Sequence, residues 1–135
     1  MKPETLIYDQ IRKITPEKSS RNIFFAAITQ TSYEIFFYSY INGVAVQCYE
    51  LAEQGLIDEN DLDRVFEAIA WIIRDSKVFD AAKINIATIT VDKSGINMGM
   101  EYVDKNARMY KIKKEWEQNN IELSHWTGRR TTGLA

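Results

Sequence analysis

The most concentrated ionisable groups in this chain are the acidic side chains between Glu50 and Asp75. The stretch holds eight acidic residues and two arginines, a local net charge of −6 in a chain whose formal net charge is −2, so the remainder carries +4. A concentrated negative surface attracts basic partners and steers their approach. We therefore interpret the stretch as a binding surface for a basic protein. Its candidate contact residues are Glu50, Glu53, Asp58, Glu59, Asp61 and Asp63.

Part of this stretch, from Asp58 to Asp63, superficially resembles a calcium-binding loop. Such a loop requires glycine at its sixth position and glutamate at its twelfth, where this chain has Asp63 and Ile69. Acidic residues in the first turn of a helix are stabilised by the helix dipole. We therefore expect a helix N-terminus here, with no metal ion and no cofactor.

The chain has a small catalytic inventory, with one histidine, His125, and one cysteine, Cys48. General acid–base catalysis needs a group held in place by a partner, and we expect His125 to lie in a mobile tail. Cys48 lies in a predicted strand with apolar neighbours, which is typical of a buried structural thiol. We therefore expect a protein that is not an enzyme. An enzyme remains a rival reading, and it would have to use Glu34 or Glu101 from the sheet.

The spacing of the apolar residues along the sequence predicts the helices and strands that position these acidic, histidine and cysteine side chains. The segments 2–14, 61–76 and 104 or 106 to about 119 have helical periodicity, and Asn60 is the expected cap of the second helix. Strands are expected at 22–29, 33–40, 44–49, 83–91 and 96–102, with Asn42-Gly43 as a two-residue hairpin turn. This order, α-β-β-β-α-β-β-α, favours an α+β fold in which an antiparallel sheet of about five strands is packed by three helices.

The length of 135 residues, with 45% hydrophobic and 27% charged residues, fits one globular domain. We expect this domain to span residues 1–124 and a mobile C-terminal tail to span 125–135. The N-terminal segment has no apolar core of the kind found in signal peptides, and no apolar run approaches the ~20 residues of a membrane span. We therefore expect a cytoplasmic protein without a membrane partner.

The segment Tyr33 to Tyr40 is rich in aromatic residues. Alternation along a strand places Phe36, Tyr38 and Tyr40 on one face. If that face were open, its tyrosines could anchor a partner, so Tyr38 and Tyr40 join the candidate contact residues. They could also stack on bases, so a single-stranded nucleic-acid-binding module remains the alternative function. The strand has no Lys or Arg to neutralise phosphates, so direct nucleic-acid binding is not the main expectation.

The pattern of segments resembles a known family, the YezG-like antitoxin and immunity proteins of bacterial polymorphic toxin and contact-dependent growth inhibition systems. The resemblance covers about residues 5 to 121 and rests on segment pattern. It differs at Ser19-Ser20-Arg21, where the family usually has a tryptophan. The similar segments are Ile7 to Pro16, Asn22 to Tyr40, Ile86 to Gly95, Met100 to Tyr102 and Lys114 to Glu117.

The resemblance implies a function that composition alone does not show. Members of this family are not enzymes; they bind the toxin domain of a neighbouring protein, often a nuclease, and cover its active or substrate-binding surface. A nuclease attracts phosphates and so presents basic clefts, which an acidic surface complements. We therefore expect an immunity protein whose partner is a cognate, basic toxin domain. The toxin's identity and the stoichiometry do not follow from this sequence.

Overall fold

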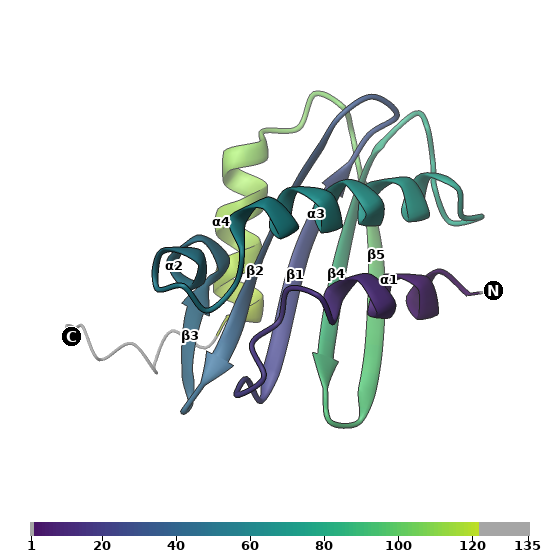
Figure 1. Cartoon of the computed structure of the whole chain (residues 1–135). Helices are drawn as coiled ribbons and strands as arrows, with labels where there is room; N and C mark the ends of the chain where they lie inside the picture. Colours follow the sequence, from purple (N-terminus) through teal and green to yellow (C-terminus); the bar gives the residue numbers. More distant parts are fainter. Residues whose placement is uncertain (1, 122–135) are drawn as a thin grey trace.

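A five-stranded antiparallel sheet with helices on both faces forms the core of the computed structural model, which describes residues 2–121 (Figure 1). This architecture confirms the expected α+β class and the five strands. The helices are α1 (Pro3–Ile11), α2 (Cys48–Glu53), α3 (Glu59–Arg74) and α4 (Met109–Asn120). The strands are β1 (Arg21–Ile28), β2 (Tyr33–Ile41), β3 (Val44–Gln47), β4 (Ile84–Asp92) and β5 (Gly95–Val103).

The central strand of the sheet is β1, in the spatial order β3-β2-β1-β4-β5. Phe24 of β1 lies opposite Phe37 of β2 on one side and Ile89 of β4 on the other. Every residue of β1 from Asn22 to Ile28 is buried. Since neighbouring residues of a strand point to opposite faces, burial of the whole strand requires cover on both faces of the sheet.

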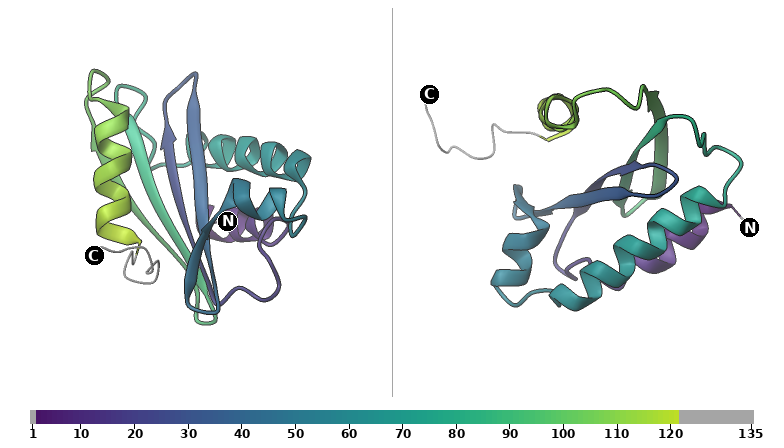
Figure 2. Two further views of the ribbon diagram at one scale, coloured as in Figure 1. Left: turned by 90° about the vertical axis from the view of Figure 1, so that its left-hand side faces the viewer. Right: turned by 90° about the horizontal axis from the view of Figure 1, so that it is seen from above.

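Helices α1, α2 and α3 lie on one face of the sheet and α4 lies on the other (Figure 2). On the first face, α3 buries an apolar stripe at helical spacing that includes Leu62, Phe66 and Ile73. The Phe66 ring meets the edge of Phe37 at 6.3 Å between ring centroids, and Phe37 stacks on Phe24 at 4.4 Å. This aromatic series fixes α3 across the middle of the sheet.

On the second face, Trp116 fixes α4 to the sheet. Its indole ring packs edge-on against Phe25 and Phe36, with ring centroids 5.4 and 5.6 Å away. The indole N–H donates a hydrogen bond of 2.9 Å to the Thr88 hydroxyl on β4. Tyr38 also donates a hydrogen bond to the Glu117 carboxylate, and Lys113 forms an ion pair with Glu34. Helix α4 therefore covers the aromatic face of β1 and β2.

The described residues contain four helices where the sequence pattern predicted three. The strand expected at 44–49 ends at Gln47, because Cys48 begins α2. The Gln47 side chain accepts a hydrogen bond from the Tyr49 amide, and Cys48 and Leu51 are buried at helical spacing. A six-residue helix is too short for its periodicity to stand out from a strand of the same length.

Two other helix starts differ from the predicted ones. Asp58, rather than Asn60, caps α3, which therefore begins at Glu59. Helix α4 begins at Met109, later than expected, because the Asp104 side chain accepts a hydrogen bond from the Asn106 amide and forms a turn there.

The Asn42-Gly43 turn is confirmed, with φ of 53° and 79° at the two residues. Both angles are positive, as a type I′ hairpin turn requires. The predicted mobile tail, 125–135, lies outside the described residues, as does His125. No helix within residues 2–121 is both long and apolar enough to span a bilayer.

The packing of α4 predicts a large stability effect at Trp116. Truncation by Trp116→Ala should lower the free energy of unfolding by about 3–5 kcal/mol, because a buried aromatic ring and its cavity are both involved. Tyr110→Ala, on the same helix but 73% exposed, should change it by less than about 0.5 kcal/mol. Urea unfolding followed by circular dichroism measures both values, and equal effects would contradict this role of Trp116.

Candidate functional site

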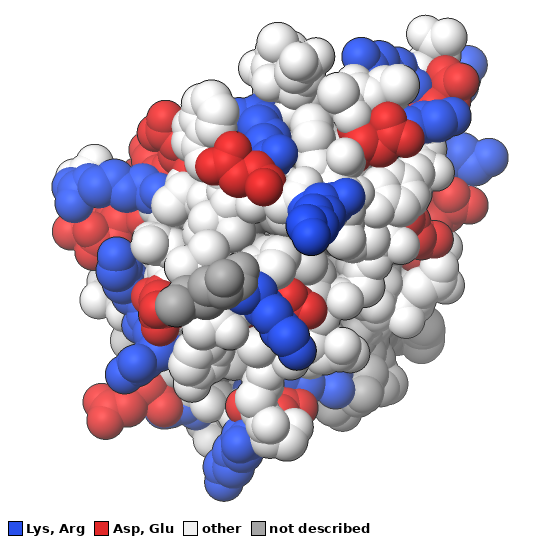
Figure 3. Space-filling view, turned by 90° about the vertical axis from the view of Figure 1, so that its right-hand side faces the viewer, with Lys and Arg blue, Asp and Glu red and all other residues white. Residues whose placement is uncertain are grey.

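The predicted acidic residues lie on two consecutive helices at one corner of the molecule. Glu50 and Glu53 belong to α2, whereas Glu59, Asp61 and Asp63 belong to the first turns of α3. A different side of the molecule, seen in Figure 3, carries basic and acidic residues that alternate between uncharged ones. At α2 and the start of α3, Glu50, Glu53, Asp58, Glu59 and Asp63 are all exposed.

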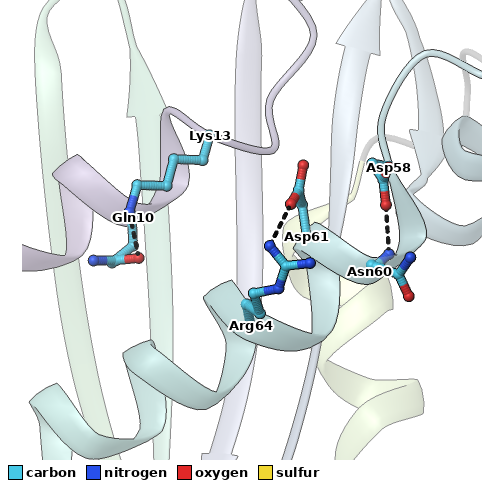
Figure 4. A network of polar contacts seen from close by, with 6 residues as sticks. All are labelled: Gln10, Lys13, Asp58, Asn60, Asp61 and Arg64. Atoms are coloured by element: carbon cyan, nitrogen blue, oxygen red, sulfur yellow. Dashed lines mark hydrogen bonds and ion pairs between the residues drawn. The ribbon is translucent and has the colours of Figure 1, made fainter.

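Two of these acids have structural roles at the start of α3 (Figure 4). The Asp58 carboxylate accepts a hydrogen bond of 2.7 Å from the Asn60 amide and so caps the helix. The Asp61 carboxylate pairs with Arg64 one turn later, at 3.4 Å. This supports the expectation that the cluster is a helix N-terminus, with Asp58 in the capping role that we assigned to Asn60.

The other acids keep their charge available to solvent. Glu50, Glu53, Glu59 and Asp63 are exposed, as is Asp58. Among residues 2–121, Asp61 is the one member of the candidate set that forms an ion pair. The Gln54 side-chain amide donates a hydrogen bond of 3.3 Å to the Glu50 carboxylate. Because that amide is neutral, the negative charge of Glu50 has no counter-charge there.

Three carboxylates form a row along one side of α3. Glu59, Asp63 and Glu67 are spaced four residues apart, so they lie on the same side of the helix. Glu67 was not among our candidate contact residues. The row marks the flank of α3 that faces the beginning of β2.

Two partly exposed tyrosines accompany this row. Tyr33, at the start of β2, is 40% exposed, and Tyr49, on α2, is 49% exposed. Partial burial raises the pKa of Tyr33, and the charges of Glu67 and Asp63 raise it further. Burial also raises the pKa of Tyr49, and the neighbouring Cys48, Asp63, Glu34 and Glu59 raise it further. We call Glu59, Asp63, Glu67, Tyr33 and Tyr49 the acidic–aromatic surface.

Tyr38 and Tyr40 do not belong to this surface, which corrects their assignment as exposed anchors. Tyr38 is 7% exposed and Tyr40 is 4% exposed. Both lie on the face of β2 that α4 covers, whereas α2 and α3 lie on the other face. Arg21 also lies over the Tyr40 ring, 4.6 Å from its centroid. Sequence alternation correctly placed the two tyrosines on one face, but it contains no information about the helix that covers that face.

Arg74 holds the far end of α3 beside Tyr33. Its guanidinium donates hydrogen bonds of 2.8 and 2.9 Å to the backbone carbonyls of Thr29 and Ser32, in the β1–β2 loop. The same group lies 5.1 Å from the ring centroid of Trp71, which is 54% exposed. The position of Tyr33 relative to the acidic row is thus set by polar contacts between α3 and the loop.

The two carboxylates of the enzyme alternative, Glu34 and Glu101, lie far apart. Register places them in one line across the sheet, with Ala27 and Ile86 on the two strands between them. Three strand spacings correspond to roughly 14 Å, beyond the about 10 Å within which paired catalytic carboxylates operate. Glu34 is also paired with Lys113. This geometry does not support a carboxylate pair as a catalytic site.

The arrangement of α2 and α3 is suited to binding by charge and by aromatic contact. Within the described part of the chain, no three His, Cys, Asp or Glu side chains converge as a metal site. A scan of the chain against protein-family models gives no match, and a search of curated proteins gives no significant relative.

The charges near the two tyrosines can be tested by titration. Asp63→Asn should lower the pKa of both Tyr33 and Tyr49, because a nearby negative charge disfavours the phenolate. Nuclear magnetic resonance of the tyrosine ring carbons over a pH series measures both values. Asp9→Asn, on α1, should leave both unchanged. Unaltered titration in Asp63→Asn would contradict the described position of this carboxylate.

The Cys48 thiol provides a second test. Burial raises its pKa to about 11, so almost none of it is thiolate at pH 8. We expect its reaction with a disulfide reagent at pH 8 to be roughly a hundredfold slower than that of a free cysteine, since the thiolate is the reacting form. Unfolding in urea should restore the ordinary rate, and a fast native reaction would show that Cys48 is not enclosed.

Proposed function

We propose that this protein is an immunity or antitoxin protein that binds and neutralises a cognate toxin domain, a basic protein and in the favoured case a nuclease. It acts by covering the basic active or substrate-binding surface of the toxin. The contact is made by the exposed acids of α2 and α3 together with Tyr33 and Tyr49. Neutralisation takes place in the cytoplasm, where a nuclease would meet its substrate.

One observation carries the proposal, the uncompensated charge at the corner formed by α2 and α3. A folded chain gains little from placing several carboxylates close together without counter-charges, because like charges repel. Asp58 has a capping role and Asp61 has an arginine partner, but Glu50, Glu53, Glu59 and Asp63 have neither. A basic partner would provide the missing counter-charge.

The tyrosines give such a surface a means of holding what the charges attract. Complementary charges mainly increase the association rate, whereas aromatic anchors at the centre of an interface contribute much of the affinity. Tyr33 and Tyr49 are exposed enough to make new contacts and are already partly fixed by the fold. The resemblance of the segment pattern to antitoxin and immunity proteins agrees with this proposal.

The geometry favours this function over a nucleic-acid platform. The tyrosine face of β2 lies under α4, with Phe36 packed against Trp116 and Tyr38 bonded to Glu117. Bases therefore could not stack there while α4 stays in place. Tyr33 and Tyr49, which are exposed, lie instead beside carboxylates, which repel phosphates.

The proposal predicts the effect of reversing charge in the acidic row. Glu59→Lys/Asp63→Lys should reduce the association rate with the toxin domain encoded beside this gene at least about tenfold at low salt. It should also weaken growth protection when the two are co-expressed. This variant leaves the Asp58 cap intact, so folding should be preserved.

The matched control is Glu101→Lys/Glu115→Lys, which changes net charge equally at exposed positions on β5 and α4. It should bind and protect like the unmodified chain. Equal protection by Glu59→Lys/Asp63→Lys would overturn the assignment of the surface. Failure of the unmodified chain to bind or to protect would overturn the proposed function.

A further inference from the structure

Strand β2 is longer than the strand that pairs with its outer edge. β3 covers the edge of β2 along Tyr38 to Ile41, where Tyr38 lies opposite Gln47 and Ile41 lies opposite Val44. The chain then leaves the sheet to form α2. The outer edge of β2 from Tyr33 to Phe37 is therefore not paired with a strand among the described residues.

The backbone groups on this edge can be identified from the contacts of β2 with its other neighbour. The carbonyl of Tyr40 accepts a hydrogen bond of 2.9 Å from Ser20, and that of Ser32 accepts one of 2.9 Å from Thr29, both on the side of β1. Backbone groups alternate in direction along a strand, so those of the odd-numbered residues point outward, away from β1.

Among Tyr33, Ile35 and Phe37, only the first two keep both outward backbone groups after the contacts among the described residues are subtracted. Ser39 and Ile41 point toward β3, and the Phe37 amide hydrogen-bonds the Cys48 sulfur. Tyr33 and Ile35 each keep an amide and a carbonyl, for which the described residues supply no hydrogen-bond partner. Tyr33 is 40% exposed and Ile35 is 4% exposed, so this unpaired edge is exposed to solvent at Tyr33 and largely enclosed at Ile35. An edge strand without a partner is a template for pairing with another strand.

A hollow of about 400 Å³ lies along this edge. Ile35 and Phe36 line it from β2, Tyr49 lines it from α2, and Tyr110 and Lys113 line it from α4. Helices α2 and α4 lie on opposite faces of the sheet, so they form walls on either side of the edge (Figure 2). The hollow is thus a groove that runs along β2 between α2 and α4.

We propose that this groove is a β-augmentation site, in which an extended segment of the partner protein pairs with β2 along Tyr33 to Phe37 and continues the sheet beyond the end of β3. The inference rests on the proposed function for the identity of the partner. To the charge attraction already proposed, it adds main-chain hydrogen bonds to Tyr33 and Ile35, which would fix the alignment of the partner's strand along β2.

The walls of the groove define the chemistry of the inserted segment. Side chains of a strand alternate between the two faces, so they would meet the α2 wall and the α4 wall in turn. Asp63 and Glu59 act electrostatically on Tyr49 at the α2 wall, which favours a lysine or arginine there. The α4 wall offers Tyr110 and the Lys113–Glu34 pair, which favours an aromatic or aliphatic side chain.

The groove is continuous with the acidic–aromatic surface. Tyr49 belongs to both, and Tyr33 of the surface is followed in β2 by Glu34, which lines the groove. A single partner could therefore place basic residues against α3 and one extended segment in the groove. A phosphate-bearing occupant would meet one further cation, Lys114 over the Tyr110 ring, but it would also meet the carboxylates of Glu34 and Glu117.

Amide hydrogen exchange tests the proposal directly. The full chain is measured alone and with the toxin domain encoded beside its gene. We expect exchange of the Ile35 amide to slow at least about tenfold on binding, since that amide becomes hydrogen-bonded. Outward amides of β5, the opposite edge of the sheet, should keep their free rates and serve as the internal control.

A pair of variants at Tyr33 separates the main-chain contact from the side-chain contact. Both Tyr33→Ala and Tyr33→Pro remove the ring, but only the proline removes the outward amide, and proline is tolerated at the first residue of an edge strand. We expect Tyr33→Pro to bind the toxin domain about three- to tenfold more weakly than Tyr33→Ala. Their unfolding midpoints show whether both variants fold equally well.

The outcomes distinguish this proposal from the function on which it rests. Binding without protection of Ile35, together with equal affinity of the two variants, would overturn β-augmentation and leave the proposed function intact. Absence of any binding to the unmodified chain would overturn the proposed function and, with it, the partner assigned to the groove. Protection of Ile35 that grows with the concentration of this chain alone would identify a second copy as the occupant and overturn the proposal.

Discussion

Complete burial of the central strand is the constraint on which the rest of the structure depends. Phe24 and Phe25 are adjacent in β1, point to opposite faces and are both inaccessible to solvent. Burial of one such ring contributes about 1.5–3 kcal/mol, so both faces must be covered to obtain both contributions. Phe37 and Phe66 cover the first face, and Trp116 of α4 covers the second.

This two-sided burial determines which surfaces can meet other molecules. The aromatic residues in the middle of the sheet are used for packing and are not accessible. The outer sides of the helices and the edges of the sheet remain. On the side of β2 these two kinds of surface meet at Tyr49, which lies between the carboxylates of α3 and the uncovered edge.

Local patterns were sufficient to predict much of the fold. The Asn42-Gly43 turn, the strands and the apolar stripe of α3 each follow from neighbouring residues, and the structure contains them. The exposure of most of the predicted acids also follows from their place on an amphipathic helix. The assignment of Tyr38 failed because its environment depends on Glu117, which is 79 residues away in sequence. Tyr33 and Tyr49 were missed for the same reason, since their acidic neighbours come from α3.

Helix α4 comes last among the described elements of the chain, and this order has a consequence for protein synthesis. Phe25, Phe36 and Tyr38 precede Trp116 in the chain, so a product that ends before Trp116 would lack the part of α4 that covers this aromatic face. Incomplete chains with exposed apolar surface are prone to aggregate and are held by chaperones. A product truncated before Trp116 would therefore be prone to aggregate as well as unstable. Completion of the last helix thus decides whether the newly made chain becomes a discrete folded molecule.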